Sequence, residues 1–131
     1  MARIQVAILD DFQNVALTTA DWSAVAERAD ITVFTDHVSD PDDVVARLAP
    51  FDVVFVMRER TPLPRSIIER LPKLRMIAST GPFNASIDMA AAEEHGIHVG
   101  TTGGTVASTV ELTWALILAT ARNLVTESMS V

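Results

Sequence analysis

Residues 53–62 read VVFVMRERTP, and this stretch sets the class of fold. Residues 53–57 form a continuous apolar run of strand length, which is typical of a strand that is buried on both faces. Arg58 and Arg60 follow the run directly, and Pro62 begins the next segment. We therefore expect a central strand of a parallel sheet whose carboxyl end lies at a polar edge.

On either side of this run, strand and helix patterns alternate. The expected strands cover residues 4–9, 31–34, 53–57, 74–78 and 97–99. Helices are expected over residues 20–29, 61–72 and 88–95. Two further helices are expected, one that begins after the cap residue Asp40 and a last one that begins at Ser108. Five short buried strands separated by helices imply an α/β fold, with a parallel sheet and helices on both faces. Right-handed crossovers make the flavodoxin-like strand order 2-1-3-4-5 the simplest layout.

The last quarter of the chain, residues 96–123, reads GIHVGTTGGTVASTVELTWALILATARN. Ser108 and Glu111 have the spacing of a capping box, and residues 110–121 are apolar apart from Glu111, Thr113 and Thr120. A helix that is apolar on every face belongs between two packed bodies. The sequence thus predicts one domain of a two-domain protein: a flavodoxin-like domain over residues 1–104, then an interdomain helix and a truncated tail over residues 105–131.

Composition excludes several classes of protein. The chain has 131 residues, 49% of them hydrophobic and 21% charged, with a net charge of −7 and no cysteine. The negative charge argues against nucleic-acid and anionic-membrane partners, and without cysteine there are no thiolate metal sites. The three histidines have no ligand spacing, so no metal site is expected. The N-terminus lacks the apolar core of a signal peptide and no apolar run is long enough to cross a bilayer, so a cytoplasmic protein is expected.

Ligands of such sheets bind beyond the carboxyl ends of the strands, which points to the loops at 10–14, 58–62, 79–84 and 100–105. Arg58 or Arg60 can bind a carboxylate or phosphate with two parallel hydrogen bonds. A solvated surface pair of these two arginines, balanced by Glu59 and Glu69, is equally compatible with the sequence. The STGPFN turn at 79–84 can present backbone N–H groups of Gly81, Phe83 and Asn84 to an anion. An ordinary strand-to-helix turn is the alternative reading of that segment.

The other two loops are less informative. The segment GTTGGT at 100–105 matches neither the GxGxxG nor the Walker A pattern, so we interpret it as a tight connection. Asp10 and Asp11 occupy positions that are acidic in receiver domains of response regulators. Met57 and Arg58 stand where those domains carry a phosphoacceptor aspartate, so a helix-capping and loop-solvating role for the acidic pair is favoured.

Four segments in order, MRERTPL, LPKLRMIASTG, IDMAAAEEHGIHV and STVELTWALILATARNL, carry a family resemblance. From residue 53 onward the chain resembles the N-terminal, substrate-binding domain of the D-isomer-specific 2-hydroxyacid dehydrogenases, the family of D-3-phosphoglycerate dehydrogenase. The resemblance implies an oxidoreductase that transfers a hydride between NAD or NADP and a small 2-hydroxy or 2-keto acid, bound between two domains.

The same resemblance implies roles for individual residues. Arg58 would hold the substrate carboxylate, together with backbone groups of Gly81, Pro82 and Phe83 and the side chain of Asn84. Thr109, at the start of the last helix, would touch the nicotinamide end of the cofactor. Phe83 replaces a glycine that is common in the family, and Glu59 replaces a serine-like residue.

The family's GxGxxG segment and its catalytic residues lie in a second domain, and none of them occurs in this sequence. The expected partners are therefore a hydroxy- or keto-acid substrate and the missing NAD-binding domain. The chain alone is expected to be inactive, to bind no cofactor and to form a homo-oligomer through its exposed helix. The alternative is a stand-alone small-molecule-binding or regulatory module of flavodoxin-like fold.

Overall fold

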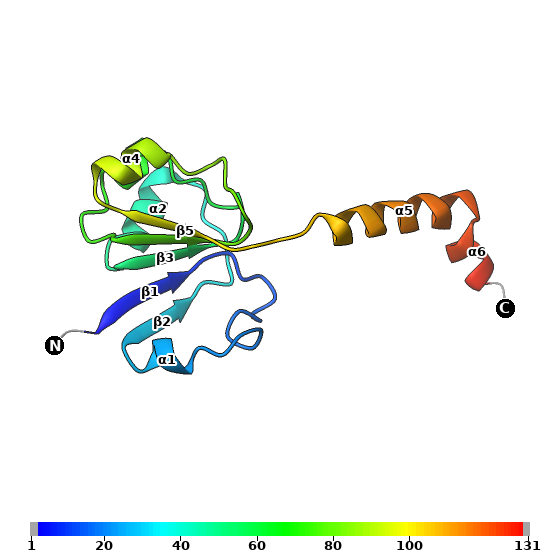
Figure 1. Cartoon of the computed structure of the whole chain (residues 1–131), viewed down its shortest axis with the longest axis horizontal. Coiled ribbons are helices and arrows are strands. Elements are labelled where there is room, and N and C mark those ends of the chain that lie inside the picture. The colour runs from blue at the N-terminus through cyan, green and yellow to red at the C-terminus, as the bar shows by residue number, and fades with distance from the viewer. Residues whose placement is uncertain (1–2, 130–131) are drawn as a thin grey trace.

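A computed structural model describes residues 3–129 of the chain, and strands alternate with helices along it (Figure 1). In chain order the elements are β1 (Ile4–Ile8), α1 (Ser23–Ala26), β2 (Ala29–Val33), α2 (Pro41–Leu48), β3 (Val53–Val56), α3 (Arg65–Ile68), β4 (Met76–Ser79), α4 (Met89–Glu94), β5 (His98–Thr101), α5 (Ala107–Ala121) and α6 (Leu124–Ser128).

The five strands form one sheet in the order β2-β1-β3-β4-β5, and every neighbouring pair is parallel. The predicted flavodoxin-like order is confirmed. In the register of β3, β4 and β5, Val53 lies opposite Met76 and Met76 lies opposite His98. The carboxyl ends of these strands therefore meet at one edge, which brings the loops after β3, β4 and β5 together.

Most of the core lies between the sheet and α2, α3 and α4. Along β3 and β4 the side chains alternate: Val54, Val56 and Ile77 are fully buried, while Val53 and Met76 keep part of their surface. Because successive strand residues point to opposite faces, this alternation shows that one face of the sheet is more fully covered than the other.

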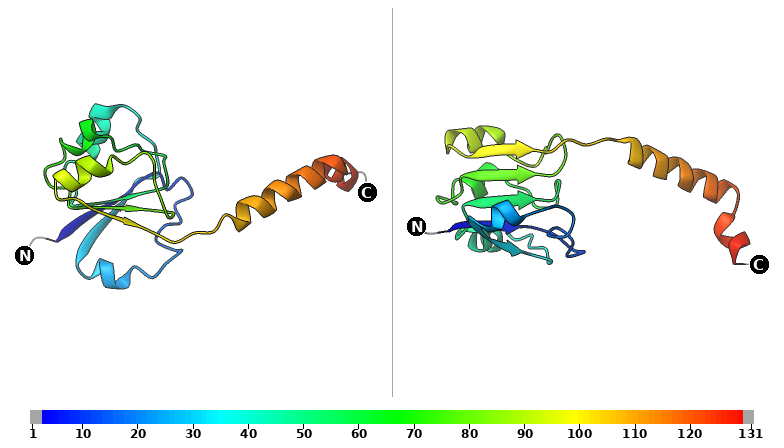
Figure 2. Two further views of the ribbon diagram at one scale, coloured as in Figure 1. Left: turned by 45° about the horizontal axis from the view of Figure 1, so that its top comes forward. Right: turned by 60° about the horizontal axis from the view of Figure 1, so that its bottom comes forward.

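Among the described residues 3–129, α1 is the only helix on the less covered face, and it has four residues. The sequence predicted a helix over 20–29, but Ala29 already pairs with Ile4 in the sheet, so the helix stops at Ala26. Trp22 packs edge-on against Phe55 with ring centroids 6.0 Å apart, and an apolar groove of about 450 Å³ lies on this face. Helices do lie on both faces, as predicted, but they cover the two faces unequally (Figure 2).

Helix starts agree with the sequence in α2 and α4 and differ in α5. The Asp40 carboxylate accepts hydrogen bonds from the backbone N–H groups of Asp42 and Asp43, as expected for an N-cap. The predicted capping box at Ser108 is wrong, because α5 already begins at Ala107. The Thr105 hydroxyl accepts a hydrogen bond from the Ala107 N–H at that end instead.

Helix α5 extends away from the sheet, and residues 102–106 connect it to β5 (Figure 1). None of its residues is buried, and Trp114 is 60% exposed. A left-handed residue, Asn123, separates α5 from α6. Within residues 3–129 no helix is both long enough and apolar enough to pass through a membrane.

Candidate functional site

The backbone of Arg58 turns sharply at the end of β3 and joins the loop after β4. Its φ is +57°, in the left-handed region that a non-glycine residue occupies only when its surroundings hold it there. The Arg58 N–H donates to the Thr80 hydroxyl at 2.9 Å, and the Arg58 carbonyl accepts from the Asn84 side chain at 2.7 Å. The loops after β3 and β4 are thus held together by hydrogen bonds on both sides of this residue.

Gly81 provides the surface against which the Arg58 guanidinium lies. A Cβ atom at this position would overlap Arg58 Nη1, and Gly81 has a φ of +95°. Glycine is therefore required both by the backbone conformation and by the close approach of the arginine. The Gly81 N–H donates to the Thr102 hydroxyl at 2.7 Å, so this N–H is engaged inside the protein, contrary to its predicted exposure to an anion.

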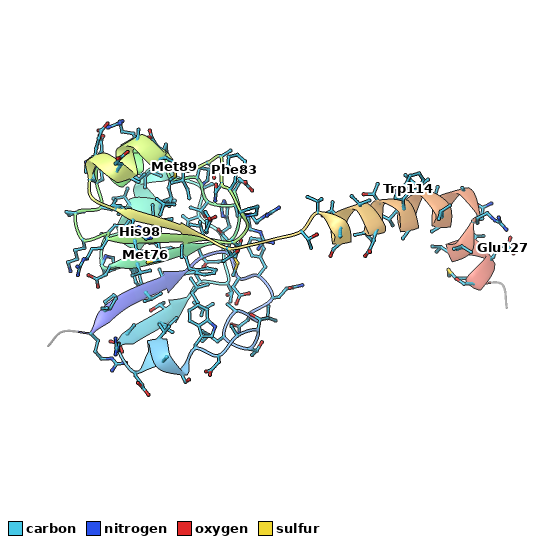
Figure 3. All side chains as sticks on the ribbon, in the orientation of Figure 1. Met76, Phe83, Met89, His98, Trp114 and Glu127 are labelled. Atoms are coloured by element: carbon cyan, nitrogen blue, oxygen red, sulfur yellow. The ribbon has the colours of Figure 1, made fainter. Side chains whose placement is uncertain are left out.

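The remaining residues of the turn divide into a buried anchor and an exposed tip. Asn84 is 7% exposed, and its amide also donates to the Ser79 hydroxyl while its carbonyl oxygen accepts from Ser86. Phe83 is 67% exposed at the sheet edge (Figure 3), next to Pro82. Within residues 3–129 the Phe83 N–H has no protein acceptor, so it can donate to a ligand.

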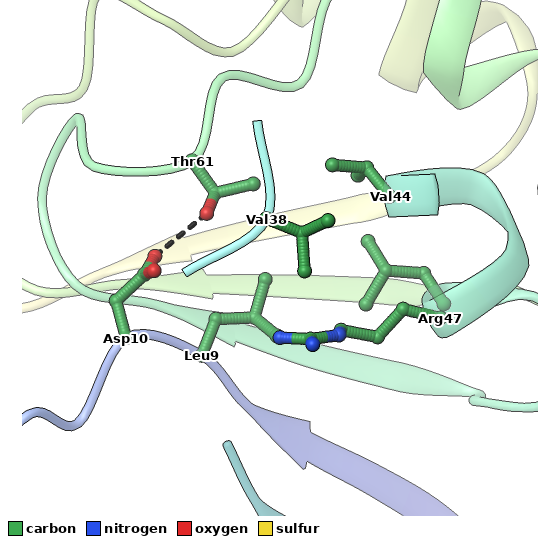
Figure 4. Close-up of a pocket in the computed structure, with 7 residues that line it drawn as sticks. Leu9, Asp10, Val38, Val44, Arg47 and Thr61 are labelled. Atoms are coloured by element: carbon green, nitrogen blue, oxygen red, sulfur yellow. Dashed lines mark hydrogen bonds between the residues drawn. The ribbon is translucent and has the colours of Figure 1, made fainter. Parts of the chain in front are cut away.

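A second, buried polar cluster supports the loop that carries Arg60. The Asp10 carboxylate accepts from the Thr61 hydroxyl at 2.6 Å and lies 2.8 Å from His37 Nδ1, while the Asp10 carbonyl accepts from Arg60 Nη1 at 2.7 Å. Figure 4 shows Asp10 and Thr61 facing each other beside a pocket of about 10 Å³, room for at most one water molecule. The polar groups of this cluster contact one another, and the pocket beside them is too small to hold a substrate.

The predicted solvating role of the acidic pair is wrong. Asp10 is 1% exposed and Asp11 is 4% exposed. The Asp11 carboxylate accepts from the backbone N–H groups of Val15 and Ala16, which belong to a turn and not to a helix, so Asp11 stabilises this turn and the predicted helix-capping role is wrong. Both residues are buried because they lie near the centre of the edge formed by the carboxyl ends of the strands. The short apolar strands in the sequence do not predict this burial on their own.

The two arginines after β3 differ in their surroundings. The Arg60 guanidinium donates to Asp10 and lies 4.9 Å from the centre of the Phe12 ring, so it is committed to the loop after β1. The Arg58 guanidinium is exposed and pairs with no acidic side chain in the part of the chain that the structure describes. Arg58 is therefore the arginine that is free to bind an anion.

The structure brings together Arg58 and the 81–84 turn but not Thr109. Thr109 is exposed on α5, where its carbonyl accepts from the Thr113 hydroxyl, and α5 points away from the sheet. Sequence reasoning missed Thr80 and Thr102, whose hydroxyls hold Arg58 and Gly81. The sequence pattern that could have indicated them is a threonine directly after each of two neighbouring strands.

Comparison with known proteins identifies the class to which this fold and site belong. The sequence profile of the D-isomer specific 2-hydroxyacid dehydrogenase catalytic domain matches residues 6–129. The chain belongs to this family, as its sequence motifs predicted.

Individual relatives carry more specific names. The chain is 30% identical to a hydroxypyruvate reductase of Thermotoga maritima in an alignment of 131 residues, which covers 99% of this chain and 40% of that protein. It is 36% identical to a D-3-phosphoglycerate dehydrogenase of Methanocaldococcus jannaschii over 84 residues, covering 63% of this chain and 16% of that protein. The crystal structure of a phosphoglycerate oxidoreductase from Vibrio cholerae O395 superposes with a TM-score of 0.78 and 38% identity, covering 88% of this chain and 36% of the other. The chain thus spans 40% or less of the length of each of these three proteins.

Proposed function

We propose that this chain is the substrate-binding domain of a cytoplasmic 2-hydroxyacid dehydrogenase and that Arg58 binds the carboxylate of the acid. The domain would cover residues 1–104, with residues 105–131 as the helix that joins it to a cofactor-binding domain. One observation carries the proposal: the guanidinium of Arg58, an exposed residue, has no acidic partner within residues 3–129 and is held against Gly81 at the carboxyl edge of a parallel sheet.

The chemistry of these groups suits a carboxylate. A guanidinium can donate two parallel hydrogen bonds to the two carboxylate oxygens, which fixes the plane of the acid as well as its charge. The Phe83 N–H, at the tip of the neighbouring turn, is a further donor. Held in this way, a 2-hydroxy acid presents its C2 carbon and hydroxyl group in a defined direction, which is the contribution that a binding domain makes to a bimolecular reaction.

We expect the dinucleotide site to lie outside the residues of this chain. Its five glycines never occur in the GxGxxG spacing, and the Gly-containing turn at Gly81 is filled by the Arg58 side chain. A nicotinamide cofactor, NAD or NADP, would supply the hydride chemistry and would be bound by another domain, with Thr109 as the contact from this chain. The substrates of the named relatives support a short 2-hydroxy or 2-keto acid as the substrate class.

The proposal is tested by titrating the ¹⁵N-labelled chain with D-glycerate, and with uncharged glycerol for comparison, while recording amide chemical shifts. With glycerate we expect chemical-shift changes centred on Arg58 and the 81–84 turn. The dissociation constant should lie in the millimolar range, which corresponds to a binding free energy on the order of −4 kcal/mol. Glycerol should cause no such shift changes. Arg58→Ala should weaken glycerate binding about tenfold or more, because a charge-assisted hydrogen bond contributes about 1.5–3 kcal/mol.

Arg75→Ala is the matched control. Arg75 is exposed and immediately precedes β4, so it lies at the opposite edge of the same sheet. The control should bind glycerate as the unaltered chain does. If Arg58→Ala and Arg75→Ala weaken binding equally, the attraction is a general charge effect and Arg58 is not a specific ligand.

A further inference from the structure

An exposed aromatic ring, that of Phe83, stands in the turn beside the Arg58 guanidinium. Phe83 is 67% exposed, and within residues 3–129 its ring makes no aromatic or cation–π contact. We propose that this ring contacts the carbon substituent on C2 of the bound acid and so selects 2-hydroxy acids whose substituent is apolar. The inference rests on the proposed function, because it takes Arg58 as the group that binds the carboxylate.

The backbone of Phe83 lies close to the proposed carboxylate site. The Arg58 guanidinium lies against Gly81, where a Cβ atom would overlap Nη1. Phe83 follows Gly81 by two residues, so their Cα atoms are at most about 7 Å apart. On the other side, Asn84 directly follows Phe83 and donates to the Arg58 carbonyl at 2.7 Å. Phe83 therefore lies between two contacts that this turn makes with the arginine.

The neighbours of Phe83 hold it in place. The Gly81 N–H is hydrogen-bonded inside the protein, and Asn84 is buried with its amide engaged. Pro82 lies against the segment after β5, where a Cβ atom on Gly104 would be 3.4 Å from the Pro82 Cδ atom. Because the backbone on both sides is fixed, ordering the phenyl ring on a ligand restricts few torsions and costs little conformational entropy.

Exposure alone would not assign a role to Phe83, because single exposed apolar side chains are ordinary on protein surfaces. Its position beside the anchor of the carboxylate is what assigns one. A carboxylate held by the Arg58 guanidinium and the Phe83 N–H places C2 and its substituent beside the turn that carries the ring. Apolar area of the substituent that is buried against the ring then strengthens binding. A domain that closed over Arg58 would enclose the ring and the acid together.

The charges around Arg58 disfavour a second anionic group on the acid. Glu59, the next residue, is exposed, and its carboxylate has no ion-pair partner in the described part of the chain. The Arg60 guanidinium is engaged with the Asp10 carbonyl. A phosphate or second carboxylate would therefore be repelled by Glu59, whereas an apolar substituent would not.

The test compares acids that each carry a single carboxylate: glycolate, D-lactate, D-2-hydroxyisocaproate and D-3-phenyllactate. Binding to the ¹⁵N-labelled 131-residue chain is measured from amide chemical shifts. The dissociation constant should fall as the apolar substituent grows. Hydroxyisocaproate should bind about fivefold or more tighter than lactate, because each fully buried methylene strengthens binding by up to about fourfold. Isotope-filtered NOEs should connect the Phe83 ring to the methyl groups of bound hydroxyisocaproate.

Phe83→Ala should abolish most of the difference between hydroxyisocaproate and lactate, and Phe83→Leu, which keeps an apolar side chain, should retain part of it. Phe12→Ala is the matched control. Phe12 is 56% exposed in the loop after β1, and its ring lies against the Arg60 guanidinium, so this control should keep the full difference. Arg58→Ala should weaken the binding of all the acids alike, which tests the proposed function separately.

The charge argument is tested with D-malate, whose substituent carries a second carboxylate. Glu59→Gln should improve the binding of malate relative to lactate by about twofold or more, because one repulsive charge is removed. An unchanged ratio of the two dissociation constants would show that Glu59 does not act against a second anionic group.

Equal dissociation constants for all the single-carboxylate acids, with binding that still requires Arg58, would overturn the role of Phe83 and leave the proposed function standing. A difference that Phe83→Ala preserves would also overturn it. The same holds for a difference that Phe12→Ala reduces as much as Phe83→Ala does, because the gain would then come from general apolar attraction. Binding of the acids that does not require Arg58 would remove both the proposed function and this inference.

Discussion

The side-chain amide of Asn84 donates a hydrogen bond to the carbonyl oxygen of Arg58, 2.7 Å away, and so ties the turn after β4 to the end of β3. The amide also donates to the Ser79 hydroxyl, so both donor hydrogens of Asn84 are engaged inside the protein. Asn84 thus acts in this structure as a positioning residue for the arginine, and its amide has no donor hydrogen left for the substrate contact that its sequence position suggested.

Replacing Asn84 by alanine should lower the free energy of unfolding by about 1–3 kcal/mol, because buried hydrogen-bond partners lose their acceptor and donor groups at once. Urea denaturation measures this change. The adjacent Phe83→Ala is the control: Phe83 is 67% exposed, and a surface change of this kind should stay within about 0.5 kcal/mol. Equal stability of both variants would contradict the anchoring role of Asn84.

The buried hydrogen bond between Asp10 and Thr61 should appear as energetic coupling between these two residues. Thr61→Val removes the hydroxyl at nearly constant volume, and Asp10→Asn keeps a side chain that tolerates the left-handed backbone of this position, whose φ is +57°. We expect each change to destabilise the chain and the double variant to cost less than their sum, by at least about 0.5 kcal/mol.

Urea denaturation of the four proteins of this cycle gives the coupling energy directly. As a control, Asp10→Asn combined with a change at Asp43, an exposed residue at the start of α2, should be additive. Strict additivity of the Asp10 and Thr61 changes would mean that their 2.6 Å contact contributes nothing to stability.

The ion pair between Arg65 and Glu94 should be visible in the titration of Glu94. The hydrogen bonds from the Arg65 guanidinium, with its charge as the second cause, lower the pKa of the Glu94 carboxyl. The stabilisation that this pair provides is present above the pKa of Glu94 in the unfolded chain, about 4.3, and is lost as the pH falls through the lower folded value. Because both side chains are exposed, solvent screening keeps that contribution small.

A carbon-detected NMR titration should therefore place the Glu94 midpoint below that of an ordinary glutamate. Arg65→Gln should move the midpoint upward, whereas Arg70→Gln, which removes the partner of Asp42, should leave it in place. An unmoved midpoint in Arg65→Gln would show that the pair does not persist in solution.

How far the sequence leads can be judged from the strands. Residues 53–56 are recognisable because a central parallel strand is apolar on both faces, and a run of valines admits few other interpretations. The edge regions are harder. The sequence predicts a helix over 20–29, but residues 29–33 pair with β1, because backbone pairing with a neighbouring strand overrides a weak helical pattern.

The candidate site divides in the same way. Arg58 and the 81–84 turn can be found from the sequence, because charged and glycine-containing segments stand directly after predicted strands. The hydroxyl of Thr102 cannot, since its partner Gly81 lies 21 residues earlier and only the pairing of β4 with β5 brings the two together.

The sequence by itself therefore determined the alternation of strands and helices, the strand order, the family and the arginine at the sheet edge, because these depend on local patterns of apolar residues, caps and short motifs. Only the tertiary structure decided that Asp10 is buried beside Thr61, and that Arg60 is committed to another loop while Arg58 has no acidic partner within the described residues. These features depend on contacts between loops up to 51 residues apart, and such contacts exist only after the parallel sheet has aligned the ends of its strands.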